Sequence, residues 1–284
     1  MIVVTGATGQ LGRLVVEGLL ERVPADRVAV AVRSSEKAAD LAAKGVEVRE
    51  ADYDRPETLA PALAGADRVL LISGSEVGRR LAQHKAVVDA AVEARVGLLV
   101  YTSVLHADTS TLGLAPEHRG TEDLIRASGL QFTLLRNGWY TENYTETARQ
   151  AAEQGILIGS AGDGRVASAT RADFAAATVE VLTGEGHEGK VYELSGDIAW
   201  SLSELAAAVS GITGRDVAYR DLTPEEHRRA LVGAGLPDAL GEMLVDIDRH
   251  IAEGALADTP GDLRRLVGRP TTPLADTLAE TLRS

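Results

Sequence analysis

Several residue types are scarce or missing in this chain, and each absence removes a class of function. The 284 residues contain no cysteine, which excludes disulfides, thiolate metal ligands and thiol nucleophiles. No block of lysine or arginine occurs and the formal net charge is −13, so a nucleic-acid surface is not expected. No apolar run approaches the roughly 20 residues of a membrane-spanning helix. Because the chain opens directly into a strand-like run, we expect no secretory signal and a cytoplasmic protein without membrane insertion.

Metal-binding and hydrolase motifs are also missing. The six histidines form neither His-Glu-x-x-His nor another close spacing with acidic residues, so no metal site is predicted. The nucleophile elbow Gly-x-Ser-x-Gly does not occur either. Aromatic residues make up only 4% of the chain, so any cluster of them points to a packing contact or a ligand.

Short aliphatic runs alternate with amphipathic stretches over the first half of the chain. Nearly continuous apolar strands in β-α-β order predict a parallel sheet covered by helices on both faces, which is a Rossmann-type α/β fold. After about residue 150 the rhythm changes to glycine-rich and helical segments. We therefore expect a Rossmann-type domain over 1–150 and a smaller C-terminal α/β lobe over 151–284, with some chain crossing back to the sheet. Six strands are predicted, at 1–5, 27–32, 46–50, 67–72, 98–103 and 132–136.

The first apolar run is followed by "TGATGQLG", with glycines three residues apart. After a strand and before a helix, the first glycine permits a tight turn, the second lets a pyrophosphate approach the backbone, and the third packs helix on strand. The N-terminal amides of the helix would then bind the phosphates. The alternative is a tight turn without a ligand. The predicted cofactor contacts here are Gly6, Ala7, Thr8, Gly9, Gln10, Leu11 and Gly12.

The end of the second predicted strand distinguishes the two dinucleotides. An NAD site places an acidic residue there, but this sequence has Arg33, with Lys37 close behind. A guanidinium can hold a 2′-phosphate bidentately, and the lysine adds a second positive charge. The pattern predicts NADPH (NADP) as cofactor, the alternative being an ordinary solvated basic residue.

Two further strand ends are expected at the cofactor crevice. Asp52, in "ADYD", is predicted to contact the adenine, although it could equally be a turn acid. After the fourth strand, "SGSEVG" follows at the edge where ligands bind in doubly wound sheets. The predicted contacts in this segment are Ser73, Gly74, Ser75, Glu76, Val77 and Gly78.

Taken with the segments "LLISGSEVG", "YTSVLHAD" and "LLRNGWYTENY", these motifs resemble the NmrA-like atypical short-chain dehydrogenases/reductases, and among them the bacterial type 2 NAD(P)H:quinone oxidoreductases. The resemblance covers nearly the whole chain. It implies NADPH-dependent two-electron reduction of quinones to hydroquinones. Two alternatives remain: an NADP(H)-binding redox sensor that regulates a partner protein, and a reductase of another electron-poor acceptor.

The sequence departs from that superfamily at the acid/base pair. Many members carry Tyr-x-x-x-Lys near the helix after strand five, but only His118 and Glu122 keep the spacing here. Ser103 stands where the superfamily places a hydrogen-bonding serine and is predicted to lie at the cofactor, where it either orients a carbonyl or merely ends a strand. A quinone needs little acid catalysis because its reduced form is aromatic and takes a proton from water, so positioning can dominate. No catalytic residue is assigned.

The quinone is expected to bind at the loop after strand six. Asn137 and Asn143 offer amides, and Trp139 and Tyr140 offer flat faces. The alternative is that the aromatic side chains anchor the second lobe to the first. Gly138 is predicted to border the nicotinamide. Ser168 is predicted to form the wall of the site opposite this loop. The physiological quinone and the oligomeric state, including a homodimer, stay open.

Overall fold

The computed structural model describes residues 1–283, and its main element is a seven-stranded sheet in the order β3-β2-β1-β4-β5-β6-β9. All neighbouring strands are parallel. The expected Rossmann-type α/β fold is confirmed, and each of the six predicted strands is present. The strands are β1 (Ile2–Thr5), β2 (Val28–Val32), β3 (Glu47–Glu50), β4 (Arg68–Leu71), β5 (Leu98–Val104), β6 (Phe132–Asn137) and β9 (Lys190–Leu194).

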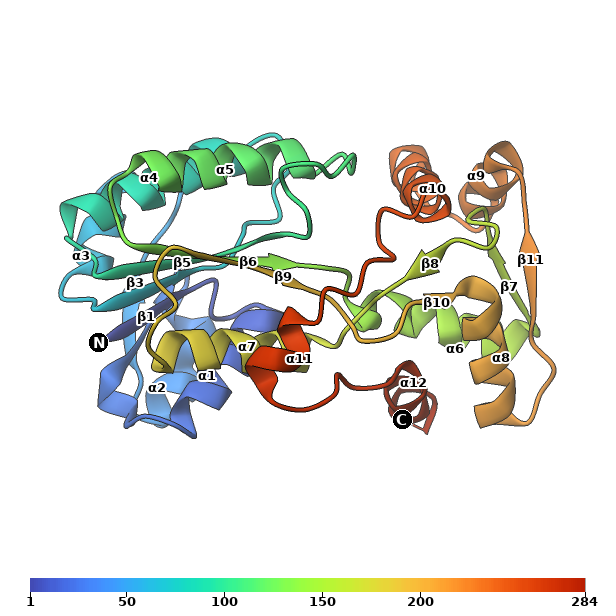
Figure 1. The fold of residues 1–284 in the computed structure, drawn as a ribbon, viewed down its shortest axis with the longest axis horizontal. Coiled ribbons are helices and arrows are strands. Elements are labelled where there is room, and N and C mark those ends of the chain that lie inside the picture. The colour runs from blue at the N-terminus through green and yellow to red at the C-terminus, as the bar shows by residue number, and fades with distance from the viewer. Residues whose placement is uncertain (284) are drawn as a thin grey trace.

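Helices cover both faces of this sheet (Figure 1). The central strands are buried on both sides; β2, for example, is the fully buried run VAVAV, as expected for β-branched residues inside a parallel sheet. One face packs on α1 and α7, and the other packs on α3, α4 and α5. The helices of this unit are α1 (Gln10–Leu20), α2 (Ala39–Ala43), α3 (Leu59–Leu63), α4 (Arg80–Glu93), α5 (Ala115–Ala127), α7 (Arg171–Thr183) and α11 (Asp262–Val267).

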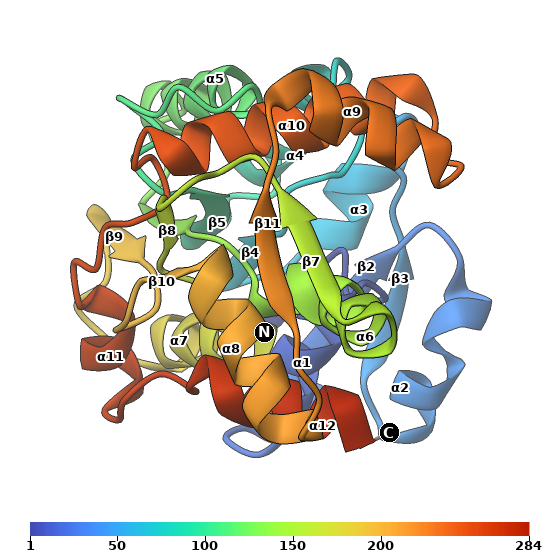
Figure 2. The ribbon, with the colours of Figure 1, turned by 90° about the vertical axis from the view of Figure 1, so that its right-hand side faces the viewer.

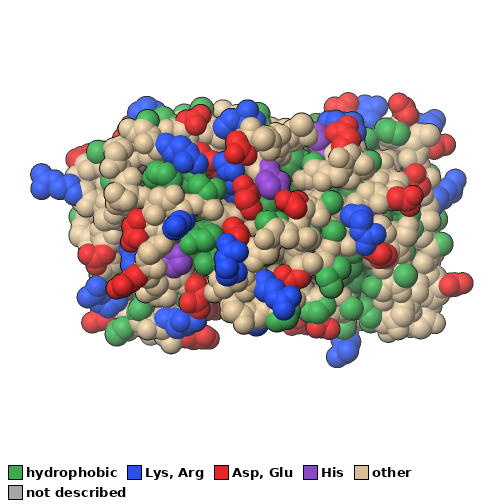
Figure 3. Space-filling model, in the orientation of Figure 1, with side chains coloured by type: hydrophobic (Ala, Val, Ile, Leu, Met, Phe, Trp, Pro, Cys, Tyr) green, Lys and Arg blue, Asp and Glu red, His purple; other side chains and the backbone are tan. Residues whose placement is uncertain are grey.

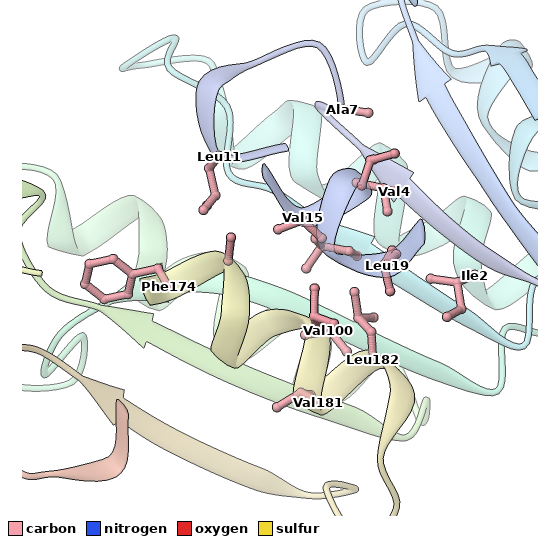
Figure 4. Packing of buried hydrophobic residues seen from close by; sticks show 14 of the residues in the cluster. Ile2, Val4, Ala7, Leu11, Val15, Leu19, Val100, Phe174, Val181 and Leu182 are labelled. Atoms are coloured by element: carbon pink, nitrogen blue, oxygen red, sulfur yellow. The ribbon is translucent and has the colours of Figure 1, made fainter. Parts of the chain in front are cut away.

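The core on the α1 side joins segments far apart in the sequence. Figure 4 shows Val15 and Leu19 of α1 close to Leu182 of α7 and Val100 of β5. Helices α1 and α7 therefore lie side by side on one face of the sheet.

The second lobe lies beyond the carboxyl ends of the strands. Figure 2 shows its elements in front of the large sheet. Capping boxes start two of its helices, with Ser201 and Glu204 at one N-terminus and Thr223 and Glu226 at the other. The elements of this lobe are α6 (Thr145–Gln154), β7 (Ile156–Gly159), β8 (Arg165–Val166), β10 (Trp200–Ser201), α8 (Leu202–Thr213), β11 (Ala218–Asp221), α9 (Pro224–Gly233), α10 (Asp238–Ala252) and α12 (Leu274–Arg283).

The two lobes interleave along the chain. The boundary expected after residue 150 falls inside α6, and α7, β9 and α11 of the second half pack on the large sheet. Register places Asn137 of β6 beside Val104 of β5 and beside Leu194 of β9. We propose dividing the chain by the sheet that each segment joins, rather than by a single cut.

Candidate functional site

The glycine turn lies between β1 and α1, where its three glycines have different surroundings. Gly6 has φ +62°, a left-handed conformation that favours glycine. A Cβ on Gly12 would lie 2.3 Å from the carbonyl oxygen of Gly6, so only glycine lets α1 pack this closely. A Cβ on Gly9 would meet nothing nearer than that oxygen, at 3.3 Å. The protein itself therefore leaves space above Gly9.

A cavity of about 510 Å³ opens at this turn, and its walls come from the segments after β1, β2, β3 and β4. Its size lies within the roughly 300–1,000 Å³ of ligand and cofactor sites. The structure brings ten of the predicted cofactor residues together here: Gly6, Thr8, Gly9, Arg33, Lys37, Asp52, Ser73, Gly74, Ser75 and Glu76. Another hollow, of about 600 Å³, lies at the opposite edge of the sheet near Met1 and Leu182, far from these loops.

The other residues predicted in the glycine turn and in the loop after β4 lie outside the cavity lining. The side chains of Ala7 and Leu11 are buried in the core, and Gln10 begins α1. Val77 is 71% exposed. The amide of Gly78 donates to Oε1 of Glu117 at 2.9 Å. These residues shape the turn and the loop rather than face the cavity.

Two side chains of α4 hold the loop after β4 in place by hydrogen bonds to its backbone. The Gly74 amide donates to Nε2 of His84 at 3.0 Å, and Nε of Arg80 donates to the Gly74 carbonyl at 2.7 Å. The Nδ1 of His84 lies 3.0 Å from the Thr121 hydroxyl. Burial, helped by the nearby Arg80 charge, lowers the pKa of His84 to about 3. The ring is therefore neutral, with its proton on Nδ1, which leaves Nε2 free to accept from the loop.

The charged residues of the cavity contact each other. The Nη1 of Arg33 lies 3.5 Å from Oε1 of Glu76. Asp52 lines the cavity but also serves its own turn, where its Oδ1 accepts from the amide of Asp54 at 3.1 Å. Both interpretations of Asp52 offered by the sequence are thus compatible with its position.

Behind the loop after β5, the place of an acid/base pair is filled by a buried network. The Ser103 hydroxyl donates to Oε1 of Glu122 at 2.6 Å, and Glu122 also pairs with Arg136 at 2.7 Å. His118 contacts the Tyr101 hydroxyl through Nδ1 at 2.7 Å, and burial lowers its pKa to about 3. The proton of Ser103 is thus directed into the protein, and His118 is neutral at physiological pH.

The loop after β6 begins with an amide that has few partners. Asn137 is 5% exposed, and neither its Nδ2 nor its Oδ1 makes a hydrogen bond of normal geometry to the described residues. Its amide lies close enough to the Tyr140 hydroxyl to oppose the rise in the pKa of Tyr140 that burial causes. Leaving a buried amide unpaired costs about 1–3 kcal/mol. Such a group at the carboxyl edge is a candidate ligand contact.

The two aromatic residues of this loop pack on different cores. Trp139 is half-buried against the core of the second lobe, whereas Tyr140 packs against the main core and lies edge-on to Phe174 at 5.3 Å. The Arg171 guanidinium stands 4.4 Å from the Tyr140 ring centre. Both rings thus make packing contacts, one with each core, and each remains partly exposed, so the anchoring role and a ligand contact are both compatible with their positions.

The remaining predicted residues of this region are engaged with neighbours. The Gly138 amide donates to the Leu194 carbonyl at 2.7 Å, and Asn143 accepts from Nη2 of Arg171 at 3.2 Å. Ser168 is buried, and its hydroxyl accepts from Nε1 of Trp200 at 3.0 Å. Ser168 thus lies within the core of the second lobe.

Several residues near the cavity or its loops were not predicted from the sequence, among them four with functional side chains. Tyr53 and Gln83 line the cavity, His84 supports the loop after β4, and Arg171 begins α7 beside the loop after β6. Arg171 follows "SAT" at the start of a helix, and no known sequence motif marks that position. The side chains of α4 reach the cavity only through tertiary packing.

Within residues 1–283, neither a metal-binding cluster nor a membrane-spanning helix is present. No group of three or more histidine, aspartate or glutamate side chains is arranged to hold a metal ion. No helix in that range combines the length and apolarity needed to cross a bilayer. On the face seen in Figure 3, acidic and basic side chains are interspersed.

A family model described as NAD(P)H-binding matches residues 6–185. Quinone oxidoreductase 2 of Escherichia coli (strain K12) is 51% identical over 279 residues, which cover 98% of each chain. This chain belongs to the NmrA-like NAD(P)H-binding family. The family recognised in the sequence is thereby confirmed, as is the expectation of a nicotinamide cofactor.

Two solved structures match this chain over nearly its whole length. The E. coli NADPH-dependent quinone oxidoreductase complexed with NADPH has a TM-score of 0.96 at 51% identity, covering 99% of each chain. The Citrobacter sp. triphenylmethane reductase complexed with NADP(H) has a TM-score of 0.96 at 41% identity, covering 99% of this chain and 100% of the other.

Proposed function

We propose that this chain is an NADPH-dependent quinone reductase that delivers two electrons as a hydride. The observation that carries the proposal is the cofactor-sized cavity at the glycine turn, combined with the buried network where an acid/base pair would stand. Full-length similarity to a quinone oxidoreductase supports the acceptor class.

The residues around the cavity fit NADPH. The open space above Gly9 suits a pyrophosphate, and the amides at the N-terminus of α1 point toward it. Arg33 and Lys37 line the cavity where a 2′-phosphate would bind. When bound, NADPH supplies the hydride. The protein holds the neutral His84 beneath Gly74 and so keeps the loop after β4 in place.

Reduction of a quinone makes modest demands on these residues. The product is aromatic and its charge is delocalised, so water can supply the proton and the protein has mainly to position the acceptor. We infer that Asn137, Trp139, Tyr140 and Asn143 form the acceptor site, with the unpaired Asn137 amide as the polar contact. Gly138 would border the nicotinamide.

Kinetics of three variants test this site. Trp139→Ala and Asn143→Ala should raise the quinone KM or lower kcat, while NADPH dissociation constants stay within about threefold. Asn137→Leu removes the amide at similar volume and should raise the quinone KM further, because the apolar side chain offers no hydrogen bond. If all three variants fold and turn quinones over normally, the acceptor binds elsewhere.

A second candidate is reduction of another electron-poor planar acceptor. The 41% identity to a triphenylmethane reductase favours this alternative. Decolorisation of a triphenylmethane dye with NADPH, compared with quinone turnover under the same conditions, ranks the two activities. We keep the homodimer as a proposal, which light scattering of the purified chain tests.

A further inference from the structure

The charged side chains that line the cofactor cavity balance each other. Arg33 and Lys37 come from the segment after β2, Asp52 follows β3, and Glu76 follows β4. The lining thus has two positive and two negative side chains. A phosphate monoester carries a charge of about −1.5 to −2 near neutral pH. A carboxylate close to its binding position therefore works against the two cations.

Glu76 is the carboxylate that directly faces Arg33. Its Oε1 lies 3.5 Å from Nη1 of Arg33. Asp52 is engaged differently, since its Oδ1 accepts from the backbone of its own turn. The side chain of Arg33 is 72% exposed and that of Glu76 is 38% exposed, so a bound ligand can reach both.

Two neighbours hold the Glu76 carboxylate beside the cavity. Its Oε2 accepts from Nη1 of Arg79 at 3.0 Å and from Nε2 of Gln83 at 3.3 Å. The same two side chains also donate to Oδ1 of Asp54, from Nη2 of Arg79 at 2.7 Å and from Nε2 of Gln83 at 3.1 Å. Moving Glu76 away from Arg33 would disturb this set of bonds, so the carboxylate stays close when a phosphate arrives.

We propose that Glu76 limits the preference for NADPH over NADH by competing with the 2′-phosphate for Arg33. A carboxylate accepts hydrogen bonds from the ribose hydroxyls of NADH but repels the phosphate of NADPH. The Glu76 side chain thus weakens the binding of NADPH without weakening the binding of NADH. The inference rests on the proposed use of nicotinamide dinucleotides in this cavity.

The test compares nucleotide affinities of Glu76→Gln with those of the unmodified chain. The amide keeps the length of the side chain and removes its charge. NADPH should bind about fivefold more tightly, which corresponds to about 1 kcal/mol, while NADH binding should stay the same or weaken. In about 1 M salt, where the Debye length is about 3 Å, the gain should shrink.

Glu57→Gln is the matched control. Glu57 is exposed in the short helix Pro56–Thr58 and does not line the cavity, and its substitution removes the same net charge. Its NADPH affinity should stay within about twofold of the unmodified value. An unchanged or weaker NADPH affinity in Glu76→Gln, or an equal gain for NADH, overturns the inference alone. If the unmodified chain binds neither nucleotide, the proposed function fails as well.

Discussion

Two alanine substitutions in the glycine turn separate its role in folding from its role in binding. At Gly12 an added Cβ would lie 2.3 Å from the Gly6 oxygen and 2.7 Å from Cα of Ala7, closer than atoms can approach. The turn or α1 must shift, and such overpacking costs about 1–3 kcal/mol. Alanine regains up to about 1 kcal/mol in helix propensity. Gly12→Ala should therefore lower the free energy of unfolding by about 1–2 kcal/mol.

Gly9→Ala should have the opposite profile. Gly9 has φ −79° and ψ 169°, which alanine adopts readily, and beyond its chain neighbours the added Cβ meets only the Gly6 oxygen, at 3.3 Å, a tight contact that a small shift relieves. The less favourable N-cap and the lower entropy of the unfolded chain nearly cancel, so stability should stay within about 1 kcal/mol. The methyl group would occupy space facing the cavity. NADPH affinity should fall at least about tenfold, or about 1.4 kcal/mol.

Thermal melts followed by circular dichroism and fluorescence titration with NADPH measure both effects. In a domain of this size each kcal/mol shifts Tm by roughly 2–4 °C, so Gly12→Ala should melt visibly earlier and Gly9→Ala should not. If Gly9→Ala binds NADPH as the unmodified chain does, the cofactor does not approach this turn. If Gly12→Ala melts normally, the packing argument is refuted.

Three further predictions concern single side chains. Arg33→Ala should weaken NADPH about tenfold and spare NADH, since a charged hydrogen bond contributes about 1.5–3 kcal/mol and the 72% exposure favours the lower end; equal losses in titrations with both nucleotides would contradict this. His118→Ala should keep steady-state turnover within about tenfold, because a buried imidazole with a pKa of about 3 is neutral at physiological pH and lacks the imidazolium proton that a general acid would donate. A loss beyond about a hundredfold with intact cofactor binding would assign it a proton-transfer role. Lowering the pH from about 7 to 5 should cost about 2 kcal/mol of unfolding free energy through His118, because the unfolded histidine, with its pKa of 6.5, binds a proton that the native one does not. Denaturant titrations at both pH values should show that His118→Gln loses about 2 kcal/mol less unfolding free energy between pH 7 and 5 than the unmodified chain does. Equal losses in the two proteins would disprove the low pKa of His118.

Most of the fold could be predicted from the sequence because its central strands are continuous apolar runs. The strand at Lys190–Leu194 is different, since it lies at the edge of the sheet and only Leu194 is fully buried. Its place beside β6 follows from a crossover through the second lobe, and no local pattern encodes that path. The division into lobes is hard to read for the same reason.

The sequence predicts the lining of the cavity best where residues follow a strand directly. Arg33, Asp52 and Ser73 stand at strand ends, so their positions follow from the order of elements. His84 was missed because a helix brings it under Gly74. For Ser103 the sequence shows a hydroxyl at a strand end but not its internal acceptor, Glu122.

The central claim is that this chain oxidises NADPH with a quinone. The direct measurement is the steady-state loss of NADPH absorbance in the purified chain with a panel of quinones, at a nucleotide concentration that saturates binding. We predict quinone-dependent oxidation, faster with NADPH than with NADH. Tight binding of NADPH without any change in absorbance across the panel would contradict the account and favour a redox-sensing protein.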